Sequence, residues 1–241
     1  ETAKAGRLDF IDWARGIGAA IMLQGHAYHS FTDPSLRETA TYVYSQFVGG
    51  MPPAIFIFLT GVTLAFLMDS MERKGVPAGQ RIIGALKRSR YLLMLAVGFR
   101  LQMWLFGLPK PVDDLFKVDV LNCMGVSVAV FSLLAVLETR ERIRWAVGAG
   151  LLIALVAPLL TYSPLRELHP WVRWYVVPDV NYFGFFPWAA FLAFGLAVGS
   201  AFRLVPHHHY SRLMQWLAML GFVLIFTAQY FSNLPFSLYE K

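Results

Sequence analysis

The stretch that decides the fold is RLDFIDWARGIGAAIMLQGHAYHSF, residues 7–31. Its apolar part is long enough for an α-helix to cross a hydrocarbon layer, which takes about 20 residues. The stretch nevertheless contains Asp12, Arg15 and His26, and ionisable groups are costly inside a membrane. These groups, and the absence of a small-residue cleavage site after them, argue against a secretory signal peptide. We therefore predict a membrane-spanning helix, over residues 10–31, that carries a polar face.

Six further apolar windows follow this helix along the chain. They cover residues 44–69, 83–106, 118–138, 143–162, 183–203 and 212–232. Their apolar runs are continuous rather than alternating, which favours helices over strands. Of the 241 residues, 57% are apolar and 15% charged, whereas a soluble domain has about 45–50% and roughly 25%. We predict an all-α integral membrane protein, a single domain over residues 1–241 with about seven transmembrane helices.

The distribution of basic residues predicts the orientation of these helices. With the N-terminus in the cytoplasm, thirteen of the 21 Lys and Arg residues lie on the cytoplasmic side, six lie on the opposite side, and Arg15 and Arg100 lie within spans. The positive-inside rule therefore favours a cytoplasmic N-terminus. Because these charges are spread over four segments, the net charge of +6 does not indicate a nucleic-acid partner. We expect a multi-pass protein of a bacterial cytoplasmic membrane.

The polar residues of the first span share one side of the helix. At about 100° per residue, a narrow stripe contains Arg15, Met22, His26 and His29, and Asp12 lies about 60° to one side. Asp12 and Arg15 are three residues apart and can form an ion pair. The stripe predicts a polar path along the helix, with roughly 16 Å of rise between Arg15 and His26. The alternative is that Arg15 extends to the headgroups and Asp12 is its structural partner.

His26 is the main candidate for a general base or nucleophile at membrane depth. An imidazole has an unperturbed pKa of about 6.5, which suits proton transfer near neutral pH. With Asp12 it forms the candidate catalytic pair, and His29 is a second candidate, on the substrate side and nearer the loop. The alternative is that these histidines are hydrogen-bonding groups at the membrane interface.

Three polar residues of later spans are candidates for the substrate side. Arg100 lies in the outer half of the third span, and Asp119 and Asn122 begin the fourth. We expect them to converge with His26 on an outward-facing polar pocket. The alternative is a structural salt bridge from Arg100 to Asp119 or Asp114.

Two clusters of basic residues are candidates for ligand binding. Lys87, Arg88 and Arg90, at the cytoplasmic end of the third span, would neutralise the phosphates of an anionic cosubstrate, or they are ordinary topological charges. The three histidines at 207–209 lie in a short loop beside Pro206. Adjacent loop histidines rarely form a specific metal site, and the single cysteine supports neither a disulfide nor a zinc motif. We expect no bound metal.

Four patches of the sequence match a known pattern. The first span carries Arg7, Asp12, Arg15-Gly16, Met22 and His26. The second carries Pro53, Phe56, Phe58 and Gly61, and the fourth carries Asn122 and Met124-Gly125, with Asn where Gln is common. The last patch is FFPWAAFLAFGLAVG, residues 185–199. In this order the four patches resemble the transmembrane acyltransferases related to heparan-alpha-glucosaminide N-acetyltransferase.

This resemblance implies a function. Such an enzyme takes an acyl group from cytoplasmic acetyl-CoA or another acyl-CoA and transfers it to a sugar amine or hydroxyl on the outer side. Arg15, with Arg88 or Arg90, would hold the anionic end of the CoA, and His26 would take the proton from the acceptor. Direct formation of an acyl-histidine is the variant mechanism. Four aromatic residues of the segment 163–182, which we expect at the membrane interface, would stack on a glycan acceptor or form an aromatic belt: Trp171, Trp174, Tyr175 and Tyr182.

A second function is consistent with the same sequence. Members of the family carry helices beyond the seven predicted here, so we expect either a fragment or a shortened relative. The alternative to an enzyme is therefore a non-catalytic accessory subunit, built on the acyltransferase scaffold, in a homo-oligomer or a larger membrane complex. A transporter is less consistent, because no pair of interrupted, symmetry-related helices is found.

Overall fold

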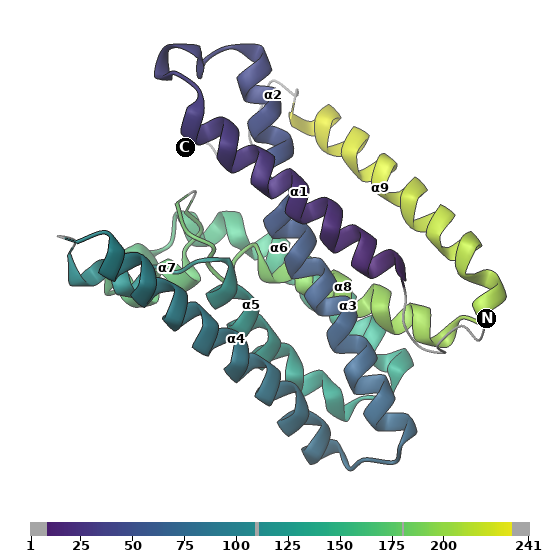
Figure 1. Cartoon of the computed structure of the whole chain (residues 1–241). Coiled ribbons are helices and arrows are strands. Elements are labelled where there is room, and N and C mark those ends of the chain that lie inside the picture. Colours follow the sequence, from purple (N-terminus) through teal and green to yellow (C-terminus); the bar gives the residue numbers. More distant parts are fainter. Residues whose placement is uncertain (1–8, 109–110, 180, 233–241) are drawn as a thin grey trace.

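The computed structural model describes residues 9–108, 111–179 and 181–232. In these ranges all regular structure is helical (Figure 1). The α-helices are α1 (Asp9–Phe31), α2 (Ala40–Gly49), α3 (Pro52–Arg73), α4 (Ala78–Phe106), α5 (Val120–Phe131), α6 (Thr139–Thr161), α7 (Pro170–Val176), α8 (Ala189–Leu204) and α9 (Tyr210–Ser232). Short 3-10 helices connect them: η1 (Pro34–Leu36), η2 (Val112–Phe116), η3 (Ser132–Val136), η4 (Pro164–Glu167) and η5 (His207–His209).

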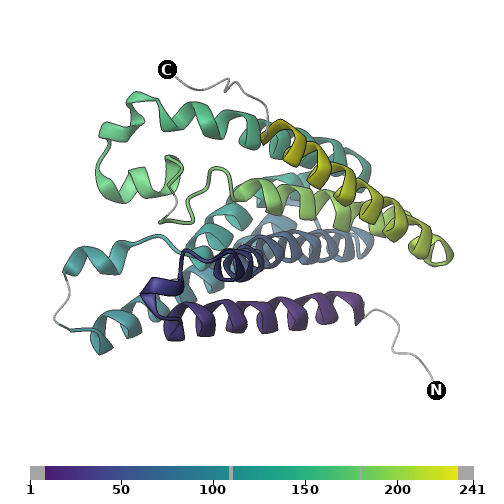
Figure 2. The ribbon, with the colours of Figure 1, turned by 90° about the horizontal axis from the view of Figure 1, so that it is seen from above.

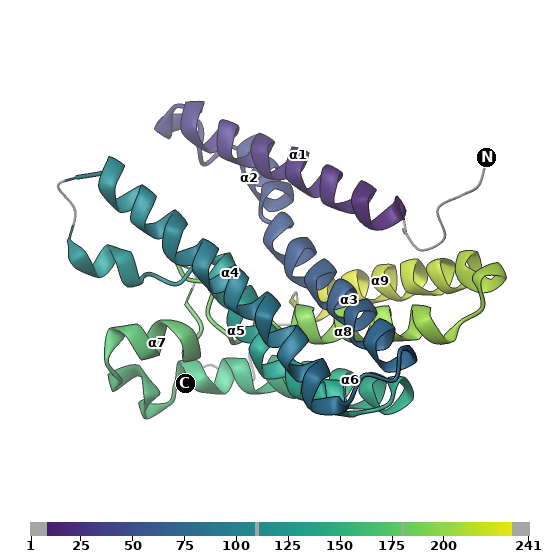
Figure 3. The same ribbon diagram turned by 60° about the horizontal axis from the view of Figure 1, so that its bottom comes forward.

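The long helices alternate in direction. Helices α1, α4, α6 and α9 run one way, and α3, α5 and α8 run back (Figures 1 and 3). We call the end of the bundle where α1 begins the N-end, and the end where α1 finishes the far end. The far end also holds α2, α7 and the connection that follows α4 (Figure 2).

The helical membrane architecture predicted from composition is confirmed. Among the residues that the structure describes, three helical stretches are long and apolar enough to cross a membrane: Ala40–Arg73, Thr139–Thr161 and His207–Tyr230. Two shorter apolar helices cover Val120–Val136 and Ala189–Leu204. Helices α1 and α4 are 23 and 29 residues long but interrupt their apolar runs with ionisable side chains. Seven crossings and a cytoplasmic N-terminus remain predictions.

Several predicted spans have different boundaries in the structure. The second span is divided into α2, which ends at Gly49, and α3, which begins at Pro52. The ring nitrogen of Pro52 has no N–H to donate, so the hydrogen bonds of α2 cannot continue through it. Pro52 and Pro53 then occupy the first turn of α3, where that donor is not needed. The fourth span continues beyond α5 as the 3-10 helix η3. The span predicted over 183–203 is helical only from Ala189, since residues 183–188 form turns.

The closest crossing in the core joins α3 to α8. A Cβ atom added to Gly61 would collide with the carbonyl oxygen of Leu192, and one added to Gly195 would collide with that of Phe58. Gly199 has the same restriction, with the carbonyl oxygen of Val62 at 2.7 Å. Small residues at such a crossing allow two backbones to approach within van der Waals contact. Fully buried aliphatic side chains surround the crossing, among them Leu64, Met68 and Leu196.

Helices α1 and α9 lie at the periphery of this core. Helix α1 is buried only at Ile11, Gly18 and Gly25. Its closest approach is to α2, because a Cβ on Gly25 would lie 2.9 Å from the Cα atom of Gly49. Gly16, by contrast, faces open space, since a Cβ added there would have no atom within 4 Å. Helix α9 stands apart from the core (Figures 1 and 2), and none of its most apolar window is buried.

Candidate functional site

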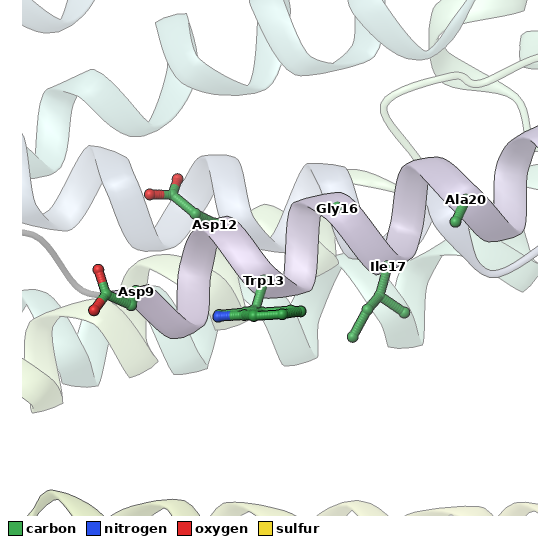
Figure 4. Close-up of a pocket in the computed structure, with 6 residues that line it drawn as sticks. All are labelled: Asp9, Asp12, Trp13, Gly16, Ile17 and Ala20. Carbon is green, nitrogen blue, oxygen red and sulfur yellow. The ribbon is translucent and has the colours of Figure 1, made fainter.

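The first turns of α1 contain the predicted ion pair. Arg15 Nη1 lies 3.5 Å from Asp12 Oδ1, and the two side chains are 42% and 40% exposed. Asp12 points away from the side of α1 that carries Trp13 and Ile17 (Figure 4). Along the helix an open groove of about 600 Å³ is lined by Asp9, Asp12, Trp13, Gly16, Ile17 and Ala20. Because Trp13, Ile17 and Ala20 lie on the other side of α1 from Arg15, this groove is not part of the predicted polar stripe. The Asp12–Arg15 pair is itself partly exposed.

A second guanidinium group comes close to Arg15 from α4. Arg88 Nη2 donates a hydrogen bond of 2.6 Å to Thr63 Oγ1 of α3, which itself lies 3.0 Å from the carbonyl oxygen of Leu59. Arg88 is partly buried and lies within electrostatic range of the Arg15 charge. In the described ranges no carboxylate forms an ion pair with Arg88. A partly buried guanidinium group that has no carboxylate partner and senses a second positive charge favours an anionic ligand.

Arg90 does not share this position. Two residues along a helix turn by about 200°, so Arg90 faces the opposite side of α4 from Arg88. There it is exposed and borders an open, apolar groove of about 690 Å³ with Leu86, Leu93 and Met94. Of the three arginines predicted to bind the cosubstrate, Arg15 and Arg88 lie within electrostatic range of each other, whereas Arg90 faces the other side of α4.

The two histidines of α1 lie towards the far end and differ in their contacts. His26 is exposed and forms no hydrogen bond with the residues that the structure describes. His29 Nδ1 lies 2.8 Å from the Tyr42 hydroxyl of α2, and the His29 carbonyl oxygen accepts a 3.0 Å hydrogen bond from Arg37 Nη2. His29 is thus engaged in holding the α1–α2 hairpin, whereas the ring nitrogens of His26 are available to a substrate.

The residues predicted for the substrate side form a structural network. Arg100 Nε lies 3.2 Å from Asp119 Oδ2. Asp119 also caps α5 by accepting hydrogen bonds from the Leu121 and Asn122 N–H groups, and Asn122 completes the capping box. Arg100 and Asp119 therefore form the structural salt bridge that was the alternative to a polar pocket with His26. No contact described by the structure joins this network to His26.

Tyr175 of α7 belongs to the same network, a contact that sequence reasoning missed. Its hydroxyl accepts a 3.1 Å hydrogen bond from Asn122 Nδ2. Burial raises the pKa of the Tyr175 hydroxyl, so the phenol stays protonated at neutral pH. Because Asn122 lies on α5, this hydrogen bond ties the 163–182 segment to the bundle.

The aromatic residues of that segment are already stacked. The ring centroids of Trp174 and Tyr182 are 5.1 Å apart, and those of Trp171 and Phe116 are 4.2 Å apart. Trp174 is buried, so one of its faces is not available to a sugar. The segment is a small helical unit packed on the far end, comprising η4 and α7.

A buried ionic cluster at the N-end was not expected from the sequence. Asp69 of α3 is 3% exposed. Its Oδ2 forms ion pairs with Arg73 Nε at 2.8 Å and with Arg203 Nε of α8 at 2.6 Å. Glu72 forms an ion pair with Arg142 Nη2 of α6 at 2.7 Å, and the Arg142 side chain is fully buried. The positive-inside argument counts these arginines only as cytoplasmic charges. The signal that could have revealed the cluster is the pair of acids in the last turns of a very apolar helix.

This cluster joins four helices at one end of the bundle, since Arg81 Nη1 of α4 also lies 3.4 Å from Glu72 Oε2. Thr139 of α6 contributes hydrogen bonds of 3.3 Å to Asp69 and 3.4 Å to Glu72. Breaking a buried pair by removing one partner leaves an uncompensated charge, which is strongly destabilising. We therefore assign the cluster a structural role in holding α3, α4, α6 and α8 together.

The histidines at 207–209 form the 3-10 helix η5, in which the His207 ring stacks on Tyr210. Over the described ranges, no group of three or more His, Cys, Asp or Glu side chains is arranged to hold a metal ion.

Comparison with known proteins identifies one family. A family model described as "Heparan-alpha-glucosaminide N-acetyltransferase, catalytic" matches residues 7–233. No curated protein and no solved structure matches the chain. The match covers α1 through α9 and includes all four sequence patches that suggested the resemblance.

Proposed function

Because the chain belongs to the heparan-alpha-glucosaminide N-acetyltransferase catalytic family, we propose that it is a membrane-embedded enzyme that transfers an acetyl or other acyl group from cytoplasmic acyl-CoA to a sugar amine or hydroxyl on the opposite side. The family indicates an acetyltransferase-type function. The donor, the acceptor and the direction of transfer are our proposal.

The observation that carries this proposal is Arg88, a partly buried guanidinium group that donates to Thr63 Oγ1, forms no ion pair in the described ranges and lies within electrostatic range of Arg15. A CoA molecule is polyanionic, and guanidinium groups bind phosphates through paired, charge-assisted hydrogen bonds. Thr63 orients Arg88, and Asp12 pairs with Arg15, so both cations are positioned before a ligand arrives. With the phosphates at this pair, the pantetheine arm would extend along α1 towards His26.

His26 would act where the thioester and the acceptor meet. Its unprotonated ring nitrogen takes the proton from the acceptor amine or hydroxyl while the acceptor nitrogen or oxygen attacks the thioester carbonyl carbon. The new C–N or C–O bond forms, the C–S bond breaks, and CoA leaves as a thiolate that recovers a proton. In the variant mechanism the His26 nitrogen itself takes the acyl group from CoA and passes it to the acceptor.

The test is binding of acetyl-CoA to the purified protein in lipid nanodiscs. We expect Arg88→Gln to weaken binding about tenfold, as loss of a charge-assisted contact to phosphate would. Arg90→Gln is the matched control, because Arg90 faces the opposite side of α4 from Arg88 and its loss should leave binding normal. Thr63→Val should weaken binding severalfold by releasing Arg88, and Thr63→Ser should restore it. Equal binding by Arg88→Gln and Arg90→Gln would contradict this cosubstrate site.

One observation favours the accessory-subunit alternative. Helix α9 has an apolar window with no buried residues, and large side chains such as Trp216, Phe222 and Phe226 are more than 60% exposed. Such a surface can be covered by lipid, by the helices of a partner protein, or by those of a second copy. Absence of acetyl-CoA binding by the intact protein would favour this alternative over an enzyme.

A further inference from the structure

A groove lies at the N-end, where α8 passes through η5 into α9. It has a volume of about 330 Å³, and one of its walls is the end of α8 and the turn after it, with Leu204 and Pro206. The second wall is formed by η5 and the start of α9, with His209, Arg212, Leu213 and Trp216. The second wall is therefore one face of a helix, because residues three, four and seven positions apart lie on the same side.

This face of the helix changes from polar to apolar in the direction of the membrane. The apolar stretch that is long enough to cross a membrane begins at His207. When α9 crosses, His209 and Arg212 therefore lie at the level of the lipid headgroups, and Leu213 and Trp216 lie next to the acyl chains. Side chains on a helix point back towards its N-terminus, which directs the Arg212 guanidinium to the interface. Trp216 is 63% exposed at a depth where tryptophan is enriched in membrane proteins.

The positive charge at this groove is not balanced by acids. Residues 180–239 contain neither Asp nor Glu. Arg212 is exposed and forms no ion pair within the part of the chain that the structure describes. Arg203, at the end of α8, is by contrast paired with Asp69 at 2.6 Å. The Arg212 guanidinium is therefore available to an incoming anion, and its planar donor array matches phosphate oxygens.

The turn between the two walls is fixed to α8. The Tyr210 hydroxyl donates a 3.0 Å hydrogen bond to the Phe202 carbonyl oxygen, and the two rings pack edge-on with their centroids 5.3 Å apart. The His207 ring stacks on Tyr210 with a centroid distance of 4.4 Å, and the His209 N–H donates a 2.9 Å hydrogen bond to the Pro206 carbonyl oxygen. A site whose walls are held in place before binding loses little conformational entropy when the ligand arrives.

We propose that this groove binds an anionic phospholipid, of the phosphatidylglycerol class, with its phosphate at Arg212 and His209 and its acyl chains along Leu213 and Trp216. The order of positive and apolar side chains along the groove matches the order of phosphate and acyl chains in such a lipid, and basic pockets between membrane helices bind anionic headgroups. A soluble phosphate compound would leave the apolar part of the groove uncovered. This lipid site is independent of the proposed acyl transfer.

The bound lipid has a structural consequence for α9. This helix leads away from the core after η5, and none of its most apolar window is buried (Figure 1). A phospholipid held at Arg212 covers the start of this surface with its acyl chains and contacts the end of α8 at Leu204. The lipid thereby connects α9 to the bundle beyond the Tyr210 contacts, so its binding stabilises the folded protein.

The test is lipid binding by the purified protein in detergent, measured by native mass spectrometry with phosphatidylglycerol and phosphatidylcholine of the same acyl chains. We expect the protein to prefer phosphatidylglycerol, and Arg212→Gln to lower the affinity for it about tenfold, as loss of a charge-assisted contact to phosphate would. Arg212→Lys keeps the charge and should keep most of the preference. Lys74→Gln is the matched control, because it removes one exposed positive charge in the turn after α3, outside the groove lining. Phosphatidylglycerol should raise the thermal unfolding midpoint of the native protein and of Lys74→Gln, but not that of Arg212→Gln.

Three outcomes would overturn the lipid site. The first is equal affinity for the two lipids, or equal phosphatidylglycerol binding by Arg212→Gln and Lys74→Gln. The second is a soluble phosphate ligand: Arg212→Gln weakens acetyl-CoA binding in phosphatidylcholine nanodiscs and leaves phosphatidylglycerol binding unchanged. The third is an interface between copies, in which Arg212→Gln changes the proportion of dimer in the mass spectra without changing lipid binding. Failure of the native protein to bind acetyl-CoA would contradict the proposed function and leave the lipid site unaffected.

Discussion

His26 is exposed near the far end of α1. Arg15 pairs with Asp12, and His29 contacts Tyr42. His26 makes no described hydrogen bond, so substitution removes a reactive group without leaving a buried partner unsatisfied. Its contribution to stability is therefore expected to be small and its contribution to transfer large.

We predict that His26→Ala reduces acetyl transfer by at least about 100-fold, since removal of a general base typically has an effect of that size. Binding of acetyl-CoA and the thermal unfolding midpoint should stay unchanged. Transfer of labelled acetate from acetyl-CoA to glucosamine measures the effect, and undiminished transfer by the variant removes His26 from the mechanism. His29→Gln is the comparison, because it alters the neighbouring histidine that contacts α2.

The helices of the core are positioned by contacts that hydropathy does not reveal. Gly61, Gly195 and Gly199 bring the backbones of α3 and α8 together, and each of these glycines faces a carbonyl oxygen of the other helix. Thr63 and Asp69 lie further along α3, so the path of α3 places both the Arg88 contact and the ionic cluster. A substitution that separates α3 from α8 would therefore displace the candidate cosubstrate site as well as the core.

We predict that Gly195→Ala destabilises the protein by about 1–3 kcal/mol or more, because the added methyl group collides with the Phe58 carbonyl oxygen and the helices must separate. Gly148→Ala is the matched control, since a Cβ at Gly148 has no atom within 4 Å. Unfolding in mixed micelles, followed by circular dichroism, measures the difference. A Gly195→Ala variant as stable as Gly148→Ala would show that the helices are not in close contact there.

The two ends of the bundle carry different elements and polar groups. The N-end contains the Asp69–Glu72 ionic cluster and the turn between α3 and α4, whereas the far end contains α7 and the end of α1. The alternating directions of the helices are those required for repeated membrane crossings. The proposed transfer requires the N-end to face the cytoplasm and the far end to face outward.

We predict that a cysteine at Glu167 in η4 reacts with a membrane-impermeant maleimide in intact cells, and that one at Lys74, in the turn after α3, reacts only after lysis. Both positions are exposed. The unsubstituted protein is the control, because its single cysteine, Cys123, is fully buried and should not be labelled. The reverse labelling pattern would invert the topology and rule out transfer of an acyl group outward from the cytoplasm.

The helical membrane class, the polar stripe of α1 and the Asp12–Arg15 pair all follow from the amino-acid sequence. These properties depend on composition and on residues three or four positions apart, so they can be read along one helix. The Arg100–Asp119 salt bridge was one of two alternatives, because hydropathy does not specify which buried charges meet. The division at Pro52 was not predicted, since both sides of that break are apolar and hydropathy runs across it.

The set of distant residues that share a site depends instead on how the helices pack. Arg15 and Arg88 are 73 positions apart, Asp69 and Arg203 are 134 apart, and Asn122 and Tyr175 are 53 apart. Their proximity follows from helix crossings set by glycine contacts and shape complementarity, which depend on the faces of two helices at once. An amphipathic pattern shows that a helix has a partner, whereas packing against a particular helix determines which charged side chains meet.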